Sequence, residues 1–222
     1  MKANHVLAAV AVALCFTACS KNDGPETLIP AERKSVENLD VTNYGKWTYI
    51  NLNTGEHKQY DDCSEWIYTD GTTVPAKAQP EIDIDWHIAV HRYEIRTNGG
   101  EVLDTQTTDM NAVSSLPAGT YVADESITHE DKEFPIITDM SKMMEGNVGY
   151  ARTATINRTL CNWVTKKETG AMPPVIYTPN NHVYVLKNKD GSWSKLQFTA
   201  AGNTETNKSG YLTFSYEHYP MK

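Results

Sequence analysis

The chain has 222 residues, of which 40% are hydrophobic and 22% charged, and its formal net charge is −8. This length is enough for one sizeable domain, and the lack of internal repeats or a long interior linker predicts a single one. The acidic balance argues against nucleic acid or an anionic lipid surface as the main partner. The common catalytic motifs, such as Gly-x-Ser-x-Gly, His-Glu-x-x-His and a phosphate-binding glycine loop, are missing, so we do not expect an enzyme.

The N-terminus has the pattern of an export signal. Lys2 precedes an apolar stretch, residues 6–16, that is too short for a permanent membrane helix, and a small residue precedes Cys19. This resembles the lipobox of bacterial lipoproteins, whose cysteine becomes the acylated first residue; an ordinary signal peptide cut nearby is the alternative. We therefore expect a signal peptide over residues 1–18, a lipidated tether over 19–38 and a β domain over 39–222. Cleavage leaves 204 residues (222 minus 18), with 19 Lys and Arg against 28 Asp and Glu.

Short strands with alternating apolar residues recur along the domain. Residues 46–56 predict a strand that ends at an Asn-Thr-Gly turn. Residues 85–100 predict the longest strand, with a β-bulge near His91-Arg92 where the alternation changes face. Residues 182–187 and 192–199, joined through Asp-Gly, predict a hairpin. Many short strands and no long 3.6-residue period indicate an all-β fold with two packed, mostly antiparallel sheets.

Residues 138–170 are the least strand-like part of the domain. Thr138-Asp139 could cap a short helix, which would place Met140, Met143 and Met144 on one face. Met172 follows in a Gly-Ala-Met-Pro-Pro turn, where a side chain can project. Methionines most often fill space in a core, but a thioether is also a soft ligand for low-charge copper or haem iron. Composition alone favours the core interpretation.

Histidine and cysteine spacing gives no clear metal signature. His87 and His91 are four residues apart, about 13 Å along a strand at roughly 3.3 Å per residue, too far to share one ion. We interpret them as ordinary, partly buried histidines. Cys63 and Cys161 could form a disulfide or remain two separate buried thiols, and the absence of Cys-x-x-Cys argues against structural zinc.

Several of these segments resemble one family, the HmuY-like haem-binding lipoproteins of gut and oral anaerobic bacteria. The matching pieces are residues 46–49, 54–56, 85–100, 109–110, 183–186, 195–199 and 211–216, with Pro117, Gly119, Tyr121 and Asp190-Gly191. The resemblance spans nearly the whole domain and implies an all-β fold with a short irregular or helical segment forming the ligand pocket. It also implies a haemophore on the outer membrane, at the cell surface or shed. Such a protein takes haem from host haemoproteins or other haemophores and delivers it to a TonB-dependent receptor.

The resemblance further implies a set of iron ligands. The best-known members use two histidines of the irregular segment, but this chain has no histidine between His129 and His182. Some relatives use two methionines instead. We therefore expect bis-methionine ligation by Met144 and Met172, with Met143 as the alternate to Met144.

Two other interpretations stay open. The chain could be a surface glycan- or protein-binding lipoprotein without a metal cofactor, in which some of its five Trp and 12 Tyr form a stacking platform. We favour core packing for these aromatic residues. The chain could also be a member of the family that has lost affinity for haem and binds another porphyrin.

Overall fold

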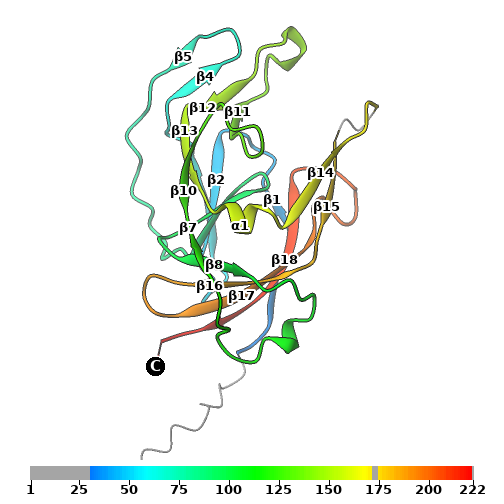
Figure 1. Cartoon of the computed structure of the whole chain (residues 1–222). Coiled ribbons are helices and arrows are strands. Elements are labelled where there is room, and N and C mark those ends of the chain that lie inside the picture. The colour runs from blue at the N-terminus through cyan, green and yellow to red at the C-terminus, as the bar shows by residue number, and fades with distance from the viewer. Residues whose placement is uncertain (1–30, 172–174, 222) are drawn as a thin grey trace, which may run out of the picture.

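The computed structural model describes residues 31–171 and 175–221 (Figure 1). Within them the regular structure is almost entirely β-strand, and the strand pairs are antiparallel. This confirms the all-β prediction. The strands are distributed over five sheets, and the two that build the core have six and four strands.

The six-stranded sheet contains both ends of the domain. Its order is β1 (Lys34–Asp40), β18 (Tyr211–Tyr219), β17 (Trp193–Ala200), β16 (Val183–Lys187), β8 (Glu101–Asp104) and β9 (Val122–Ala123). The predicted hairpin is confirmed: β16 pairs with β17 through the Asp190-Gly191 turn, where Gly191 has a φ of +87°. The predicted tether boundary at residue 38 is wrong, because β1 begins at Lys34 and pairs with β18.

The second core sheet has the order β3 (His57–Asp61), β2 (Lys46–Ile50), β6 (Ile88–His91) and β7 (Glu94–Thr97). The single bulged strand predicted over residues 85–100 is wrong. The chain instead makes a tight hairpin, in which His91 pairs with Glu94 around the two-residue turn Arg92-Tyr93. The change of apolar face in the sequence therefore marks a reversal of the chain.

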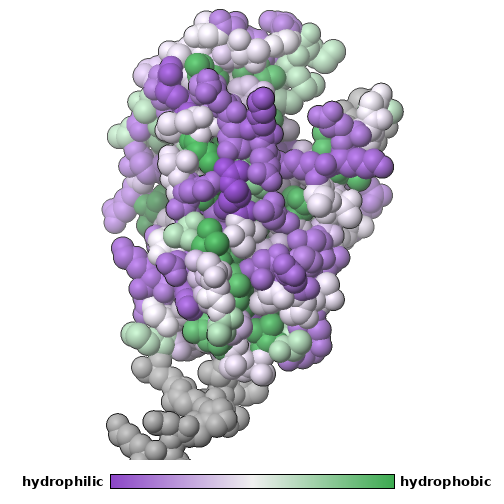
Figure 2. All heavy atoms as spheres, viewed as in Figure 1, coloured by the Kyte–Doolittle hydropathy of each residue, from purple (hydrophilic) through white to green (hydrophobic). Residues whose placement is uncertain are grey.

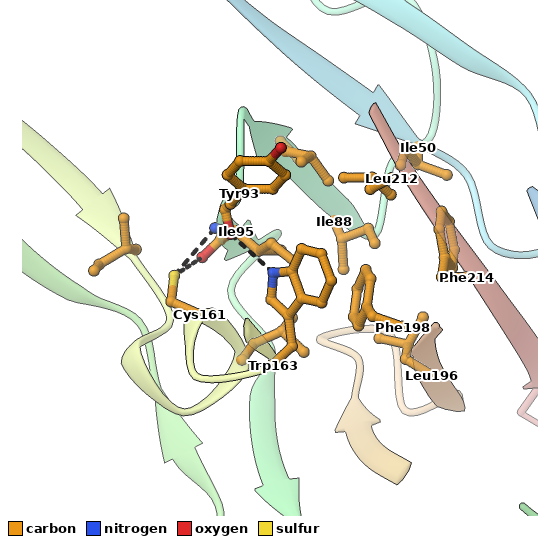
Figure 3. Close-up of a cluster of buried hydrophobic side chains, with 14 of the residues drawn as sticks. Ile50, Ile88, Tyr93, Ile95, Cys161, Trp163, Leu196, Phe198, Leu212 and Phe214 are labelled. Atoms are coloured by element: carbon orange, nitrogen blue, oxygen red, sulfur yellow. Dashed lines mark hydrogen bonds between the residues drawn. The ribbon is translucent and has the colours of Figure 1, made fainter. Parts of the chain in front are cut away.

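Side chains from both core sheets interlock in one buried cluster (Figure 3). Trp163 lies between the sheets: its indole N–H donates to the Tyr93 carbonyl oxygen at 2.9 Å, and its ring packs 4.8 Å from that of Phe198. The Cys161 thiol lies beside them, accepting from the Ile95 N–H at 3.1 Å and donating to the Ile95 carbonyl. Cys63 lies elsewhere and is also a free thiol, so the cysteines are separate, as one of the two alternatives held.

Three smaller sheets extend from this core (Figure 1). One has the order β11 (Ile137–Asp139), β12 (Gly149–Ala151), β4 (Trp66–Tyr68) and β5 (Thr73–Val74). The other two are the pair of β10 (Glu125–Thr128) with β13 (Thr153–Ile156), and the hairpin of β14 (Val164–Glu168) with β15 (Val175–Pro179). The hairpin is paired to no other strand of the described chain and projects from the body (Figure 1).

The helical elements are single turns: η1 (Met110–Ala112), η2 (Met143–Glu145) and α1 (Arg158–Cys161). Asn157 caps α1, its side-chain oxygen accepting the Leu160 N–H at 3.0 Å. The helix predicted to start at Thr138 is wrong. Thr138 lies within β11, and only a 3₁₀ turn follows, without a side-chain cap, closed by Gly146 at a φ of +77°.

Candidate functional site

An open groove of about 290 Å³ lies at the edge of the core, between the body and the projecting hairpin. Figure 2 shows this hollow beside the hairpin, with hydrophilic residues around it. The β6–β7 turn, the segment leading into β11, and the β14–β15 hairpin form its walls. Its lining residues are Tyr44, His91, Arg92, Tyr93, Glu94, Lys132, Glu133, Pro135, Ile137, Lys166, Glu168, Val175 and Tyr177.

The base of the hairpin is anchored in the core of the body. Trp163 and Val164 are buried in the core, and the Asn180 N–H donates to the Trp163 carbonyl at 2.9 Å. Beyond Val164, the residues of β14 are exposed. One face of each strand looks into the groove, so the hairpin supplies one of its walls. The described part of the hairpin stops at Ala171 and resumes at Val175.

An ion pair with one buried partner, Glu94, forms the floor of the groove. Glu94 is 7% exposed, and its carboxylate lies 2.9 Å from the Lys166 ammonium. Burial alone would raise the pKa of Glu94, but the neighbouring His91 ring and the charge of Lys166 overcome it and lower that pKa to about 2. Burial opposes the charge of Lys166, yet Glu94 raises its pKa. Both groups are therefore charged at neutral pH.

His91 is oriented by the backbone and is poorly placed to bind a ligand. It is fully buried, and its Nε2 lies 2.7 Å from the Tyr44 carbonyl oxygen, so Nε2 carries the proton and donates. Its Nδ1 faces the Glu94 carboxylate at 3.9 Å. His87 bonds a different backbone group, the Leu52 N–H, so the two histidines do not converge. Among the described residues, no group of three or more His, Cys, Asp or Glu is arranged to hold a metal ion.

The walls combine aromatic and apolar surface with unpaired cations. The Tyr93 and Tyr177 rings pack 4.2 Å apart, and Pro135 and Ile137 lie across from them in the lining. The Arg92 guanidinium stacks 4.3 Å from the centre of the Tyr44 ring and donates to the Thr42 carbonyl. Neither Arg92 nor Lys132 has a carboxylate partner in the part of the chain described. The groove can therefore accept a ligand with a flat apolar body and acidic groups.

The β11–β12 connection carries Met140, Met143 and Met144, none of which lines this groove. Met140 lines an adjoining pocket of about 420 Å³, and Tyr44 lines both pockets. In η2, Met143 is 48% exposed and Met144 is 92% exposed, so neither packs in the core. Met172 falls between β14 and β15 in the sequence and lies outside the described residues, as does Cys19. The predicted Met144–Met172 pair therefore stays a prediction.

Several lining residues were missed by sequence analysis. Glu94 and Lys166 are 72 residues apart and carry no common motif. Tyr177 and Lys132 likewise come from unrelated segments. No local pattern marks such residues, because only the tertiary fold brings them to one groove.

An antiparallel β core with a ligand-sized groove outside it defines the general class: a β-sheet protein with a lateral binding site. The family model described as HmuY protein matches residues 43–216. The chain belongs to the HmuY family.

Solved structures agree with this assignment. An apo HmuY analog from Tannerella forsythia has 36% identity and a TM-score of 0.73, with 86% of this chain and 96% of that chain covered. Apo PinO from Porphyromonas gingivitis has 29% identity and a TM-score of 0.71, covering 86% and 99%. A Bacteroides vulgatus protein described as HmuY-like and heme-binding has 31% identity and a TM-score of 0.66, covering 88% and 98%. Comparison with curated proteins gave no match.

No helix in the described residues has the length and apolar character needed to cross a membrane.

Proposed function

We propose that this protein is a haemophore-like lipoprotein that binds haem, iron protoporphyrin IX, in the groove. It would take haem from host haemoproteins or from other haemophores and deliver it to a TonB-dependent outer-membrane receptor. Family membership and the relative described as heme-binding support haem as the ligand. The observation that carries the proposal is a groove that is walled by aromatic residues and edged by cations, together with two exposed thioethers, Met143 and Met144, in the connection that follows β11, whose first residue Ile137 lines the groove.

The groove residues fit the chemistry of haem. Tyr93, Tyr177 and Ile137 offer surface to a flat apolar macrocycle. Arg92 and Lys132, which lack carboxylate partners among the described residues, can pair with the two carboxylates of the ligand. These features require no rearrangement of the Glu94–Lys166 ion pair on the floor.

The iron ligands we propose are Met144 and Met172, with Met143 as the alternate to Met144. Sulfur is a soft ligand that suits ferrous haem better than ferric haem. His91 is the histidine that lines the groove, and its Nε2 is already committed to the Tyr44 carbonyl. The two ligands must approach the iron from opposite faces. If Met172 is one of them, only one of Met143 and Met144 can be the other.

The location follows from the N-terminal sequence. We propose that residues 1–18 are removed and that a lipid on Cys19 attaches the protein to the outer membrane. One of the solved relatives, from Bacteroides fragilis, is itself described as a lipoprotein, with 34% identity and a TM-score of 0.66. No nucleic acid partner is expected, given the acidic charge.

The test is a haem titration of the mature chain, followed by absorbance under air and under dithionite. We expect a sharp Soret band and low-spin bands on reduction, both weakened in Met144→Ala and in Met172→Ala. Met221→Ala is the matched control, because Met221 is 70% exposed and does not line the groove. If Met143→Ala weakens the bands and Met144→Ala does not, Met143 is the ligand.

A wild-type chain without any Soret shift would overturn haem binding. Because a thioether does not titrate, the spectrum should also persist at pH 6, and its loss there would implicate a histidine. If no Soret shift is seen, the remaining candidates are a glycan- or protein-binding lipoprotein without a metal cofactor, or a member of the family that binds another porphyrin.

A further inference from the structure

A second pocket, of about 350 Å³, lies at the junction of the two core sheets and shares no residue with the groove. The segment before β6 and the residue after β7 form one side, and the β16–β17 turn forms the other. The lining residues are Asp85, Trp86, His87, Asn98, Asn188, Lys189 and Asp190. Nothing in the proposed haem function uses them.

His87 presents a hydrogen-bond donor in this pocket. The residue is 7% exposed, and its Nδ1 accepts the Leu52 N–H at 3.1 Å. The proton of the neutral ring is therefore on Nε2, which has no hydrogen-bond partner in the described chain. A metal ion would need a lone pair at this nitrogen. The tautomer therefore argues against a cation site, in agreement with the absence of any metal-type cluster among the described residues.

The other polar groups are mostly acceptors, and several are held in place. Asp190 Oδ1 accepts the Ser192 N–H and hydroxyl, which leaves Oδ2 free. Asn98 Nδ2 donates to the Trp86 carbonyl at 3.0 Å, which leaves the Asn98 side-chain oxygen free. Asp85 has no hydrogen bond or ion pair to any described residue. Two carboxylates against the single ammonium of Lys189 disfavour an anionic ligand, and this density of polar groups disfavours an apolar one.

Trp86 adds an aromatic surface of fixed orientation. Its ring meets that of Tyr49 edge to face at 4.9 Å and 89°, and it is only half-buried. Aromatic surface beside fixed donors and acceptors suits a sugar ring: its C–H face can lie on the indole, while each hydroxyl both donates and accepts.

We propose that this pocket binds a neutral hexopyranose unit, as a free sugar or as the end of a glycan. The site is independent of the haem groove. Its volume is in the lower part of the range of small-molecule sites, about 300–1,000 Å³.

The test is calorimetric titration of the mature chain with D-galactose, D-glucose, D-mannose and N-acetyl-D-glucosamine, together with a glycan array. We expect at least one sugar to bind, and Asp85→Asn to weaken it about tenfold. Since Asp85 has no partner in the described chain, this variant removes no contact of the fold. Trp86→Ala should weaken binding further. Glu37→Gln, an exposed carboxylate on β1 away from the pocket, is the matched control and should bind as wild type.

If a glycan binds on the array and the free monosaccharide displaces it, the ligand is the end of a glycan. If only the monosaccharide binds, the ligand is a free sugar. The proposal is overturned if no sugar binds in either format, or if Asp85→Asn and Trp86→Ala bind as wild type does. It is also overturned if putrescine, used as a cationic probe, binds in a manner that depends on Asp85 while the sugars do not. Haem absorbance of each variant reports separately on the groove and on folding.

Discussion

Glu94 is a buried carboxylate that keeps its charge through Lys166 and His91. Its pKa is lowered from 4.5 to about 2, so the folded state binds fewer protons than the unfolded state between these values. The stabilisation is present above about pH 4.5 and is lost as the pH falls towards 2, with a magnitude on the order of 2 kcal/mol. Urea unfolding between pH 7 and pH 2.5 measures it.

In Glu94→Gln, the free energy of unfolding should be lower at pH 7, and its decline below pH 4.5 should be shallower. The variant keeps the size of the side chain but leaves Lys166 without its partner. An unchanged pH slope in Glu94→Gln would show that the carboxylate does not control acid stability.

His218 titrates in a different window. Burial, with a smaller contribution from neighbouring His87, whose ring lies 4.9 Å away edge to face, lowers its pKa to about 4. The folded state therefore resists protonation, and stability should decline as the pH falls from about 6.5 to 4, by on the order of 2 kcal/mol. His218→Gln should remove much of this decline, whereas exposed His57→Gln should not. Equal declines in the two variants would contradict this assignment.

The β16–β17 and β6–β7 hairpins differ in how well the sequence predicts them. The β16–β17 hairpin was predictable because Asp190-Gly191 supplies a residue suited to positive φ. The β6–β7 turn uses Arg92 and Tyr93, which carry no turn signal, so the sequence suggested a continuous strand. Arg92 has a φ of +53° and is held there by its bond to the Thr42 carbonyl and its stacking on Tyr44. These long-range contacts stabilise a positive φ that the local sequence does not favour.

This turn allows a comparison of two variants. Arg92→Ala and Arg92→Gly lose the same side-chain contacts, but only alanine keeps the cost of left-handed backbone. We expect Arg92→Gly to be more stable than Arg92→Ala by about 1 kcal/mol. Chemical denaturation at pH 7 measures the difference. Equal stabilities would mean that the turn relaxes once the arginine side chain is removed.

The helical prediction for residues 138–144 failed for a related reason. The short-range pattern of Thr138-Asp139 and the methionines is compatible with a helix, but Ile137 and Asp139 pair with β12. Pairing across the sheet fixes the backbone as far as Asp139, and only three residues of the connection that follows form η2. In this short turn, Met143 and Met144 are exposed. Their exposure could not have been predicted from spacing alone.

At the scale of the whole molecule, the fold of residues 31–171 and 175–221 is held without a covalent cross-link. Cys161 is fully buried, and burial raises the pKa of its thiol, whereas Cys63 is only partly buried. In the mature chain carrying Cys19→Ala, thiol titration should count about one reactive thiol in the native state and two in urea. Reducing agent should leave stability unchanged. No reactive thiol in urea without reductant would reveal a disulfide.

The pairing of β1 with β18 determines how the protein carries mechanical load. Lys34 pairs with Tyr216 near the C-terminus, Asp40 pairs with Tyr211, and Arg33 adds an ion pair to Glu217 at the point where the chain enters the sheet. With the proposed anchor at Cys19, a partner that pulls on the groove stretches the protein along β1. The β1–β18 hydrogen bonds then bear the force together, in shear, and do not open one after another. With that proposed anchor, the first strand would act as a mechanical clamp that keeps the domain folded while it is pulled against the membrane.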